Sequence, residues 1–211
     1  MKKKDYIKSI DGAERRFFMA PVSVEKRTEG QDGPAVIEGM AALYNHKTDM
    51  GWFEEEILPG AFDEVMNDDV RCLFNHNPNY VLARSNQGKG TLQLYTKDNG
   101  LAYRYTTPNR SYAKDLADAI EKGDVSQSSF AFKAKETIWV QRSDEKELRQ
   151  IKLVENLYDV SPVTYPAYAD TSVAKRSHEA AAEERQEENN GPSFDDFNAR
   201  YLINKNSNIL K

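Results

Sequence analysis

Short apolar runs separated by turn-forming residues recur along the first 170 residues of the chain. Runs rich in Val, Phe, Tyr and Thr, and bounded by Gly, Pro, Asn or Asp, are typical of β-strands. The pattern predicts strands over residues 17–24, 35–44, 53–58, 70–76, 81–84, 91–96, 101–106, 125–132, 137–140 and 151–163. Many short strands with turn signals between them favour one β-rich domain of barrel or sandwich type.

Two segments show helical spacing instead of strand alternation. The clearest, over residues 111–121, carries one apolar stripe formed by Tyr112, Leu116, Ala119 and Ile120. Gly123 follows and ends the predicted helix. A shorter helix is predicted over residues 61–66, where Phe62, Val65 and Met66 have i, i+3, i+4 spacing. The fold class that we expect is therefore α+β and rich in strands.

The two ends of the chain differ in composition from its centre. Residues 1–16 are polar and charged and predict a flexible arm, and residues 17–175 can bury a core. Residues 176–211 predict a mobile tail, because too little apolar surface remains there to offset the entropy of ordering. One apolar set in this tail has helical spacing and could instead form a small helix that docks on a partner: Phe194, Phe197, Tyr201 and Leu202.

Charge and composition exclude several classes of protein. The 211 residues have a net charge of −5, which does not favour nucleic-acid binding. No apolar stretch approaches the roughly 20 residues of a membrane span, and no apolar region follows Lys2–Lys4 as in a signal peptide. The single cysteine, Cys72, cannot form an internal disulfide, which fits a reducing cytosol. No metal-binding motif or phosphate-binding glycine loop is present, so we expect no metal and no cofactor.

The segment over residues 124–132 offers three candidate nucleophiles, Ser126, Ser128 and Ser129. Alternate side chains of an extended strand share a face. Ser128 then lies beside Phe130 and Phe132, which should point into the core. Ser129 lies on the opposite face beside the small Ala131, which leaves room for a substrate. The alternation therefore favours Ser129, although an ordinary serine-rich strand end has the same pattern.

The chain has three histidines that could act as a general base: His46, His76 and His178. His76 ends a predicted strand and precedes a loop, a place from which an imidazole can reach a cleft. A surface histidine that hydrogen-bonds its loop is the alternative. Cys72 lies four residues before His76, roughly 13 Å along a strand, too far for a Cys–His dyad. We interpret Cys72 as a small buried hydrophobe.

Asp159 is a carboxylate inside an apolar run, between Tyr158 and Val160. Burying a lone carboxylate is costly, so orienting an imidazole would explain it, and an outward-facing position would explain it equally well. Glu155 is the rival for this role. The charged run Glu54–Glu56 is interpreted as a solvated face. Serine, histidine and carboxylate from separate strands would match the way serine-hydrolase sites are built on unrelated folds.

In five motifs, in the same order, the chain resembles the prohead maturation proteases of tailed bacteriophages. The motifs lie at Gly39–Tyr44, Phe53–Phe62, Val70–His76, Ser126–Phe132 and Leu157–Tyr168, with Thr171 after the last. Each motif alone is weakly specific, but the ordered set, which spans about residues 36–175, is strong. These proteases are serine endopeptidases related in fold to the herpesvirus capsid protease, assemblin. The resemblance therefore implies a closed or partly closed β-barrel flanked by a few helices.

The resemblance also implies residue roles and a biological setting. His76 matches the family's base, Ser129 its nucleophile and Asp159 its third residue. The implied substrates are the scaffold and the scaffold-like arm of the major capsid protein. The implied place is the interior of the immature capsid in the host cytoplasm, or a bacterial cytoplasm when the gene belongs to a prophage. Self-cleavage in the tail after Lys175 and a homodimer are further expectations, and neither nucleic acid nor membrane is expected as a partner.

Four residues depart from the family pattern. The family usually has Glu where this chain has Asp159, often Gly-Met where it has Gln127 and Ser128, and Gly where it has Ala131. These departures motivate an alternative, a catalytically silent assembly or scaffold-binding module of the same fold. An esterase is disfavoured because the G-x-S-x-G motif is missing. The sequence does not locate the oxyanion hole; backbone amides after the serine, Arg142 and Arg149 are the options.

Overall fold

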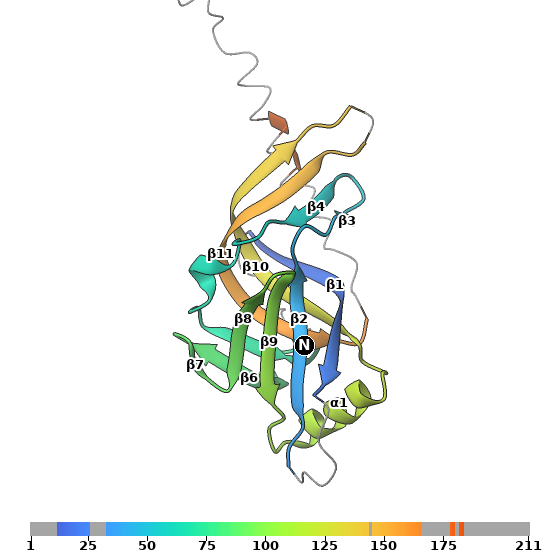
Figure 1. Cartoon of the computed structure of the whole chain (residues 1–211), viewed down its shortest axis with the longest axis vertical. Coiled ribbons are helices and arrows are strands. Elements are labelled where there is room, and N and C mark those ends of the chain that lie inside the picture. Colours follow the sequence, from blue (N-terminus) through green and yellow to red (C-terminus); the bar gives the residue numbers. More distant parts are fainter. Residues whose placement is uncertain (1–11, 26–32, 144, 166–177, 180–181, 184–211) are drawn as a thin grey trace, which may run out of the picture. The chain divides into compact units, whose positions relative to one another are not determined.

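The computed structural model describes residues 12–25, 33–143, 145–165, 178–179 and 182–183. The chain divides into two units, residues 1–174 and residues 175–211. In the first unit the described residues form an 11-stranded sheet and one α-helix (Figure 1). In the second unit the described residues 178–179 and 182–183 are helical. Most of the predicted tail, the apolar set from Phe194 to Leu202 and the arm up to residue 11 lie outside the described residues.

The elements follow one another along the first unit with short connections. The strands are β1 (Ala13–Val24), β2 (Val36–Leu43), β3 (Thr48–Asp49), β4 (Glu54–Ile57), β5 (Val70–Leu73), β6 (Val81–Asn86), β7 (Lys89–Gly90), β8 (Leu92–Lys97), β9 (Gly100–Thr106), β10 (Gln127–Val140) and β11 (Leu148–Val163). The helices are α1 (Ser111–Glu121) and two 3₁₀ turns, η2 (Asp63–Val65) and η3 (Phe74–His76).

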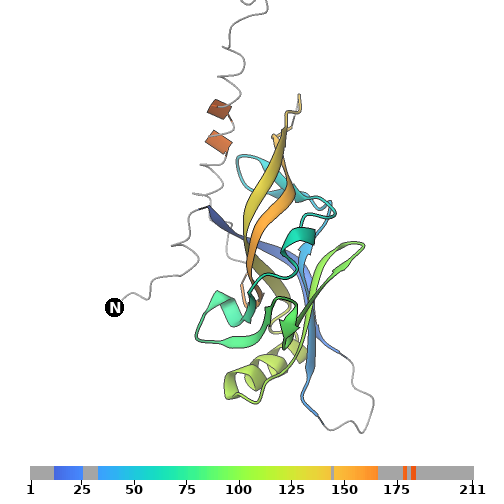
Figure 2. The same cartoon turned by 90° about the vertical axis from the view of Figure 1, so that its left-hand side faces the viewer.

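The sheet curls into a nearly closed barrel, which confirms the predicted fold class (Figures 1 and 2). Its strand order is β7-β6-β5-β11-β10-β1-β2-β9-β8, so β10 and β11 are central. Beyond the barrel, β10 and β11 continue as a long hairpin, and the short β4 pairs with the first residues of β11 (Figure 1). Most predicted strands are present, but the runs over 125–132 and 137–140 are parts of one strand, β10.

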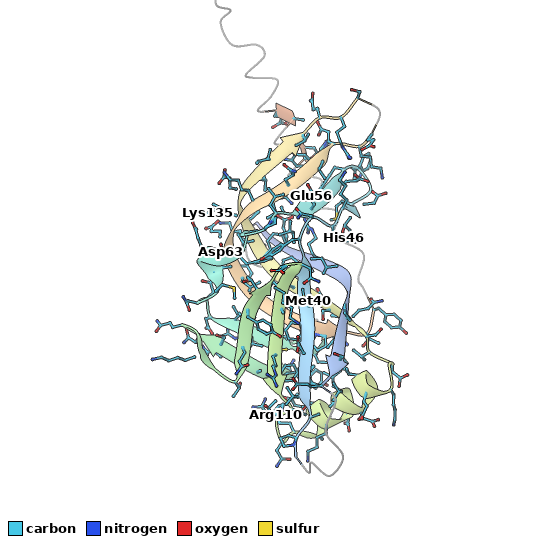
Figure 3. All side chains as sticks on the ribbon, viewed as in Figure 1. Met40, His46, Glu56, Asp63, Arg110 and Lys135 are labelled. Atoms are coloured by element: carbon cyan, nitrogen blue, oxygen red, sulfur yellow. The ribbon has the colours of Figure 1, made fainter. Side chains whose placement is uncertain are left out.

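Apolar side chains from the strands of the barrel and from α1 fill its interior. The buried face of α1 consists of Ala113, Leu116, Ala117 and Ile120. Met40 of β2 points into this core, whereas Lys135 of β10 is exposed (Figure 3). The short helix predicted over 61–66 is a single 3₁₀ turn over Asp63–Val65, in a segment where Ala61, Phe62 and Val65 are buried.

The first strand begins at Ala13, four residues before the predicted start at Phe17. Its first part pairs with β10 and its last residues pair with β2, with a register shift between Phe18 and Pro21. A proline lacks the N–H that a ladder needs, so the strand changes partners where Pro21 interrupts it. Because of this change of partner, β1 connects β10 to β2 within the barrel.

A buried ionic cluster connects β1, β4 and β11. Arg16 donates to Glu14 and Glu55, the latter at 2.5 and 2.8 Å, and Arg149 donates to the same two carboxylates at 2.8–2.9 Å. All four side chains are only 3–4% exposed. The interpretation of Glu54–Glu56 as a solvated face is therefore wrong for Glu55 and for Glu56, which is 8% exposed. Arg16 of β1 and Arg149 of β11 compensate the charge of Glu55, and Gln150 donates to Glu56 at 2.8 Å.

Replacing Glu14 with glutamine should destabilise the protein by about 3–5 kcal/mol at neutral pH, because two buried arginines would then share one carboxylate. Burial alone would raise the pKa of Glu14, but attraction to Arg16 and Arg149 and hydrogen bonds from them lower it from 4.5 to about 2. A lowered pKa stabilises the fold above pH 4.5, and this contribution is lost as the pH falls towards 2. Urea unfolding between pH 7 and 2 should therefore show a smaller pH dependence for E14Q than for wild type.

The matched control for this substitution is Glu136→Gln, which removes an exposed pair with Lys152 at 2.6 Å. Exposed pairs contribute about 0–1 kcal/mol, so the control should unfold almost like wild type. Equal effects of the two substitutions would mean that the buried cluster does not hold β1 in place.

Candidate functional site

Three neighbouring elements bring Ser129, His76 and Asp159 together. The central strands β10 and β11 are antiparallel, and Ala131 pairs with Asp159. On the other side of β11, β5 runs parallel to it, with Arg71 paired to Asp159. Because parallel strands run in the same direction, the turn that follows β5 lies beside the residues of β11 after Val160, and Asn75 contacts Thr164 there. His76 therefore lies at the part of the sheet that carries Ser129 and Asp159.

His76 lies in a turn and not at the end of a strand. The predicted strand over 70–76 ends at Leu73, and Phe74–His76 form the 3₁₀ turn η3. Asn75 and His76 both have left-handed backbone angles, with φ of 53° and 54°. These left-handed angles change the direction of the chain. As a result, the His76 imidazole lies over the sheet.

The three side chains form a hydrogen-bonded row. His76 Nδ1 lies 2.5 Å from Asp159 Oδ1, and His76 Nε2 lies 2.5 Å from Ser129 Oγ. A carboxylate only accepts hydrogen bonds, so in the neutral imidazole Nδ1 carries the proton and Nε2 presents its lone pair to the serine hydroxyl. His76 thus contacts both of the other sequence-predicted residues, in the order that general-base activation of a serine requires.

The two adjacent serines of β10 face opposite sides of the sheet. Ser128 points into the core, where its hydroxyl lies 2.8 Å from the hydroxyl of the buried Tyr103. Ser129 points to the outer face with Ala131, which packs against Ala13. This is the arrangement that strand alternation predicted.

Ser129 is nevertheless fully buried, so the predicted room for a substrate beside Ala131 is absent in this state. The neighbouring strand β1 contributes to this closure, since Phe17 pairs with Ser129 and the Arg16 carbonyl accepts a hydrogen bond from Ser129 Oγ at 2.9 Å. A hydroxyl has one proton and cannot donate to His76 Nε2 and to this carbonyl at once. Attack by Ser129 therefore requires the hydroxyl to turn from Arg16 to His76.

A β-bulge places Asp159 on the outer face of the sheet. Ala131 pairs with Asp159, but the next residue of β10, Phe132, pairs with Leu157, which leaves Tyr158 as the extra residue. Leu157 therefore faces the core with Phe132, whereas Asp159 faces outwards with Ala131. Without the bulge, residues 157 and 159 would share one face.

The polar contacts and burial of Asp159 and Glu155 distinguish the two candidates for the third catalytic residue. Ser161 donates to Asp159 Oδ1 at 2.8 Å, and Asp159 is only 1% exposed. Glu155, in contrast, is 44% exposed and pairs with Lys133 at 2.9 Å. The sequence pattern did not identify Ser161 as a residue of the site. Its position two residues after Asp159 in a strand would have placed it on the same face of the sheet as Asp159.

Cys72 lies in the hydrophobic core, as predicted, and is completely buried. Burial, reinforced by the charge of Asp159, raises the pKa of its thiol well above the usual value. Since the thiolate is the reactive form, this cysteine is a poor nucleophile. Its role is to fill the core beneath the site.

The remaining candidates lie elsewhere. His46 is in the exposed loop between β2 and β3 (Figure 3), and His178 belongs to the second unit. Arg149 is part of the buried ionic cluster, and Arg142 binds Glu54 at 2.8 Å. Both guanidinium groups are thus engaged by carboxylates other than Asp159. Neither arginine is therefore positioned as an oxyanion-hole residue.

Within the described ranges, no group of three or more His, Cys, Asp or Glu side chains could hold a metal ion. In the same part of the chain, none of the helices has the length and apolar character that a membrane crossing requires.

Two comparisons with known proteins give a match. The model of the caudovirus prohead serine protease family matches residues 21–185. Among solved structures, the chain is similar to the bacteriophage T4 capsid assembly protease, gp21, with 12% sequence identity and a TM-score of 0.45. That similarity covers 73% of this chain and 98% of the T4 chain. No curated protein matches significantly in sequence.

Proposed function

Since the chain belongs to the caudovirus prohead serine protease family, we propose that it is a serine endopeptidase in which Ser129 is the nucleophile, His76 the general base and Asp159 the residue that orients His76. The observation that carries this assignment is the row of two 2.5 Å contacts from Asp159 through His76 to Ser129. The three residues come from different elements, so the row is a product of the fold and not of local sequence. Each faces the same side of the sheet.

In the proposed reaction, Nε2 of His76 accepts and returns the protons, while Nδ1 stays hydrogen-bonded to Asp159. Ser129 Oγ attacks the carbonyl carbon of the peptide bond while its proton passes to His76 Nε2. The tetrahedral intermediate collapses, His76 gives this proton to the departing amine, and an acyl-enzyme remains. A water molecule, deprotonated by His76, then attacks the ester and releases Ser129 with its proton restored. Asp159 accepts a hydrogen bond from Nδ1 throughout and stabilises the imidazolium.

We further propose that the substrates are the scaffold and the scaffold-like arm of the capsid protein, inside the immature capsid of an infected cell. Family membership and the polar tail support this proposal. The tail beyond Lys175 carries the self-cleavage site that we propose. Because Ser129 is fully buried in this state, a substrate must displace the Arg16 carbonyl from the hydroxyl, which ties activity to a movement of β1. A homodimer is part of the same proposal.

Co-expression with the capsid and scaffold proteins of its own phage tests the substrates. Intact-mass spectrometry of cells that express wild type should show truncated capsid or scaffold chains, and these should be absent with Ser129→Ala. The cut positions would then define the specificity. Identical masses with both variants, together with normal capsid assembly, would contradict the protease and favour the silent assembly module.

A further inference from the structure

The turn that carries His76 is fastened to the end of β11 by a pair of hydrogen bonds. Asn75 Nδ2 donates to Thr164 Oγ1 at 3.1 Å, and the Thr164 backbone N–H donates to Asn75 Oδ1 at 2.9 Å. The two residues are 89 positions apart in the chain. Thr164 directly follows β11, the strand that carries Asp159. One amide side chain thus joins the loop of the base to the strand of the orienting carboxylate.

The backbone of this turn explains why such a fastening is required. Asn75 has φ of 53° and ψ of 36°, and His76 has φ of 54°. Left-handed conformations are unfavourable for residues with a Cβ, and two in succession persist only where the surroundings hold them. Asparagine tolerates this region better than most residues. The backbone of Asn75 therefore tolerates the left-handed conformation, and the hydrogen bonds of its side chain to Thr164 stabilise it.

The side chains of this pair lie at the surface, unlike the row that they support. Asn75 and Thr164 are exposed, whereas the side chains of His76 and Asp159 are 6% and 2% exposed. Exposed hydrogen bonds between loop residues contribute little to global stability. Their consequence is local, because a shift of the turn would move the imidazole relative to the hydroxyl and the carboxylate. In a reaction of this kind, a displacement of about 1 Å can reduce the rate about 10²-fold.

We infer that Asn75 is a positioning residue, which through Thr164 holds His76 between Asp159 and Ser129. This inference rests on the proposed function, since it assigns Asn75 a part in the same reaction. Asn75 does not touch the reacting atoms. It acts on the position of the base, and its loss should therefore lower the rate of the chemical step and leave the fold intact.

The decisive variant is Asn75→Gly, because glycine adopts positive φ freely and only the two side-chain hydrogen bonds are lost. Labelling by a fluorophosphonate probe measures the effect: Ser129 Oγ bonds to phosphorus, fluoride leaves, and the serine proton passes to His76. We expect the second-order labelling rate to fall by about 10- to 100-fold with an unchanged melting temperature. In Thr164→Val, which loses only the hydroxyl acceptor, the labelling rate should fall less. Thr164→Ser should label like wild type.

A residue of the same loop provides the matched control. Asn79 donates from its backbone and its amide to Asn77 Oδ1, at 3.0 and 2.8 Å, and both bonds stay within the loop. Asn79→Ala should therefore label like wild type. Proton NMR adds a direct readout, since the strongly hydrogen-bonded proton on His76 Nδ1 should resonate far downfield. That resonance should shift or broaden in Asn75→Gly and stay unchanged in Asn79→Ala.

The outcomes separate the inference from the proposed function. If wild type labels at Ser129 and Asn75→Gly labels at the same rate with the same downfield resonance, Asn75 is not a positioning residue and the protease assignment stands. If the folded wild type shows neither labelling nor cleavage of capsid proteins, the proposed function fails, and the inference fails with it. A rate loss in Asn79→Ala as large as in Asn75→Gly would show that general disturbance of the loop, and not the bond to Thr164, lowers the rate.

Discussion

Replacing Ser129 with alanine should remove fluorophosphonate labelling and peptide cleavage while the protein stays folded. The expected loss is about 10⁶-fold, as when the nucleophile of a serine hydrolase is removed. The substitution deletes one buried hydroxyl and leaves His76 with its bond to Asp159. Loss of one net hydrogen bond changes stability by about 1 kcal/mol. Labelling measured by intact mass, and thermal unfolding measured in parallel, would show an inactive and nearly unaltered fold.

Ser128→Ala is the matched control, and it should behave in the opposite way. The Ser128 hydroxyl hydrogen-bonds the Tyr103 hydroxyl in the core. Removing it leaves the buried Tyr103 hydroxyl without that partner, which should lower the free energy of unfolding by about 1–3 kcal/mol. The outer face with Ser129 is unchanged, so labelling should continue at the wild-type rate wherever the protein is folded. Labelling of Ser129→Ala, together with no labelling of a folded Ser128→Ala, would show that Ser128 is the nucleophile.

Asp159→Asn should reduce the labelling rate by about 10³- to 10⁴-fold without removing the nucleophile. The asparagine amide can donate to Nδ1 and thereby favours the imidazole tautomer with its proton on Nε2. That tautomer cannot accept the serine proton. The side chain keeps its size, and the amide nitrogen in the place of Oδ1 can donate to both His76 Nδ1 and the Ser161 hydroxyl, so the geometry of the row should persist. A change in rate without a change in melting temperature is the expected signature.

Glu155→Gln distinguishes the two carboxylates of β11 that compete for this role. Glu155 pairs with Lys133 at the surface, so its substitution should leave the labelling rate unchanged and alter stability by less than about 1 kcal/mol. A large rate loss in Glu155→Gln, with little loss in Asp159→Asn, would overturn the assignment of Asp159.

The sequence alone was sufficient for the features that depend on neighbouring residues. Strand alternation separated Ser129 from Ser128, since Phe130 and Phe132 mark the core face of β10. Turn residues located the hairpins, and apolar spacing located α1. The resemblance over the ordered motifs pointed to the family that the comparisons show. The inferences on strands, turns and α1 use patterns within a few residues, where backbone geometry alone fixes which side chains share a face, whereas the resemblance uses the order of motifs along the chain.

Only the tertiary structure decided the features that depend on pairing between distant segments. The polar residues Glu14 and Arg16 belong to the segment predicted as a flexible arm, but they lie in β1 and are buried against Glu55 and Arg149. The carbonyl of Arg16 reaches Ser129 from 113 positions away. The bulge at Tyr158, which turns Asp159 outwards, exists only in the register of β10 against β11. Local sequence does not encode such register, because it depends on which strands become neighbours once the whole barrel has formed.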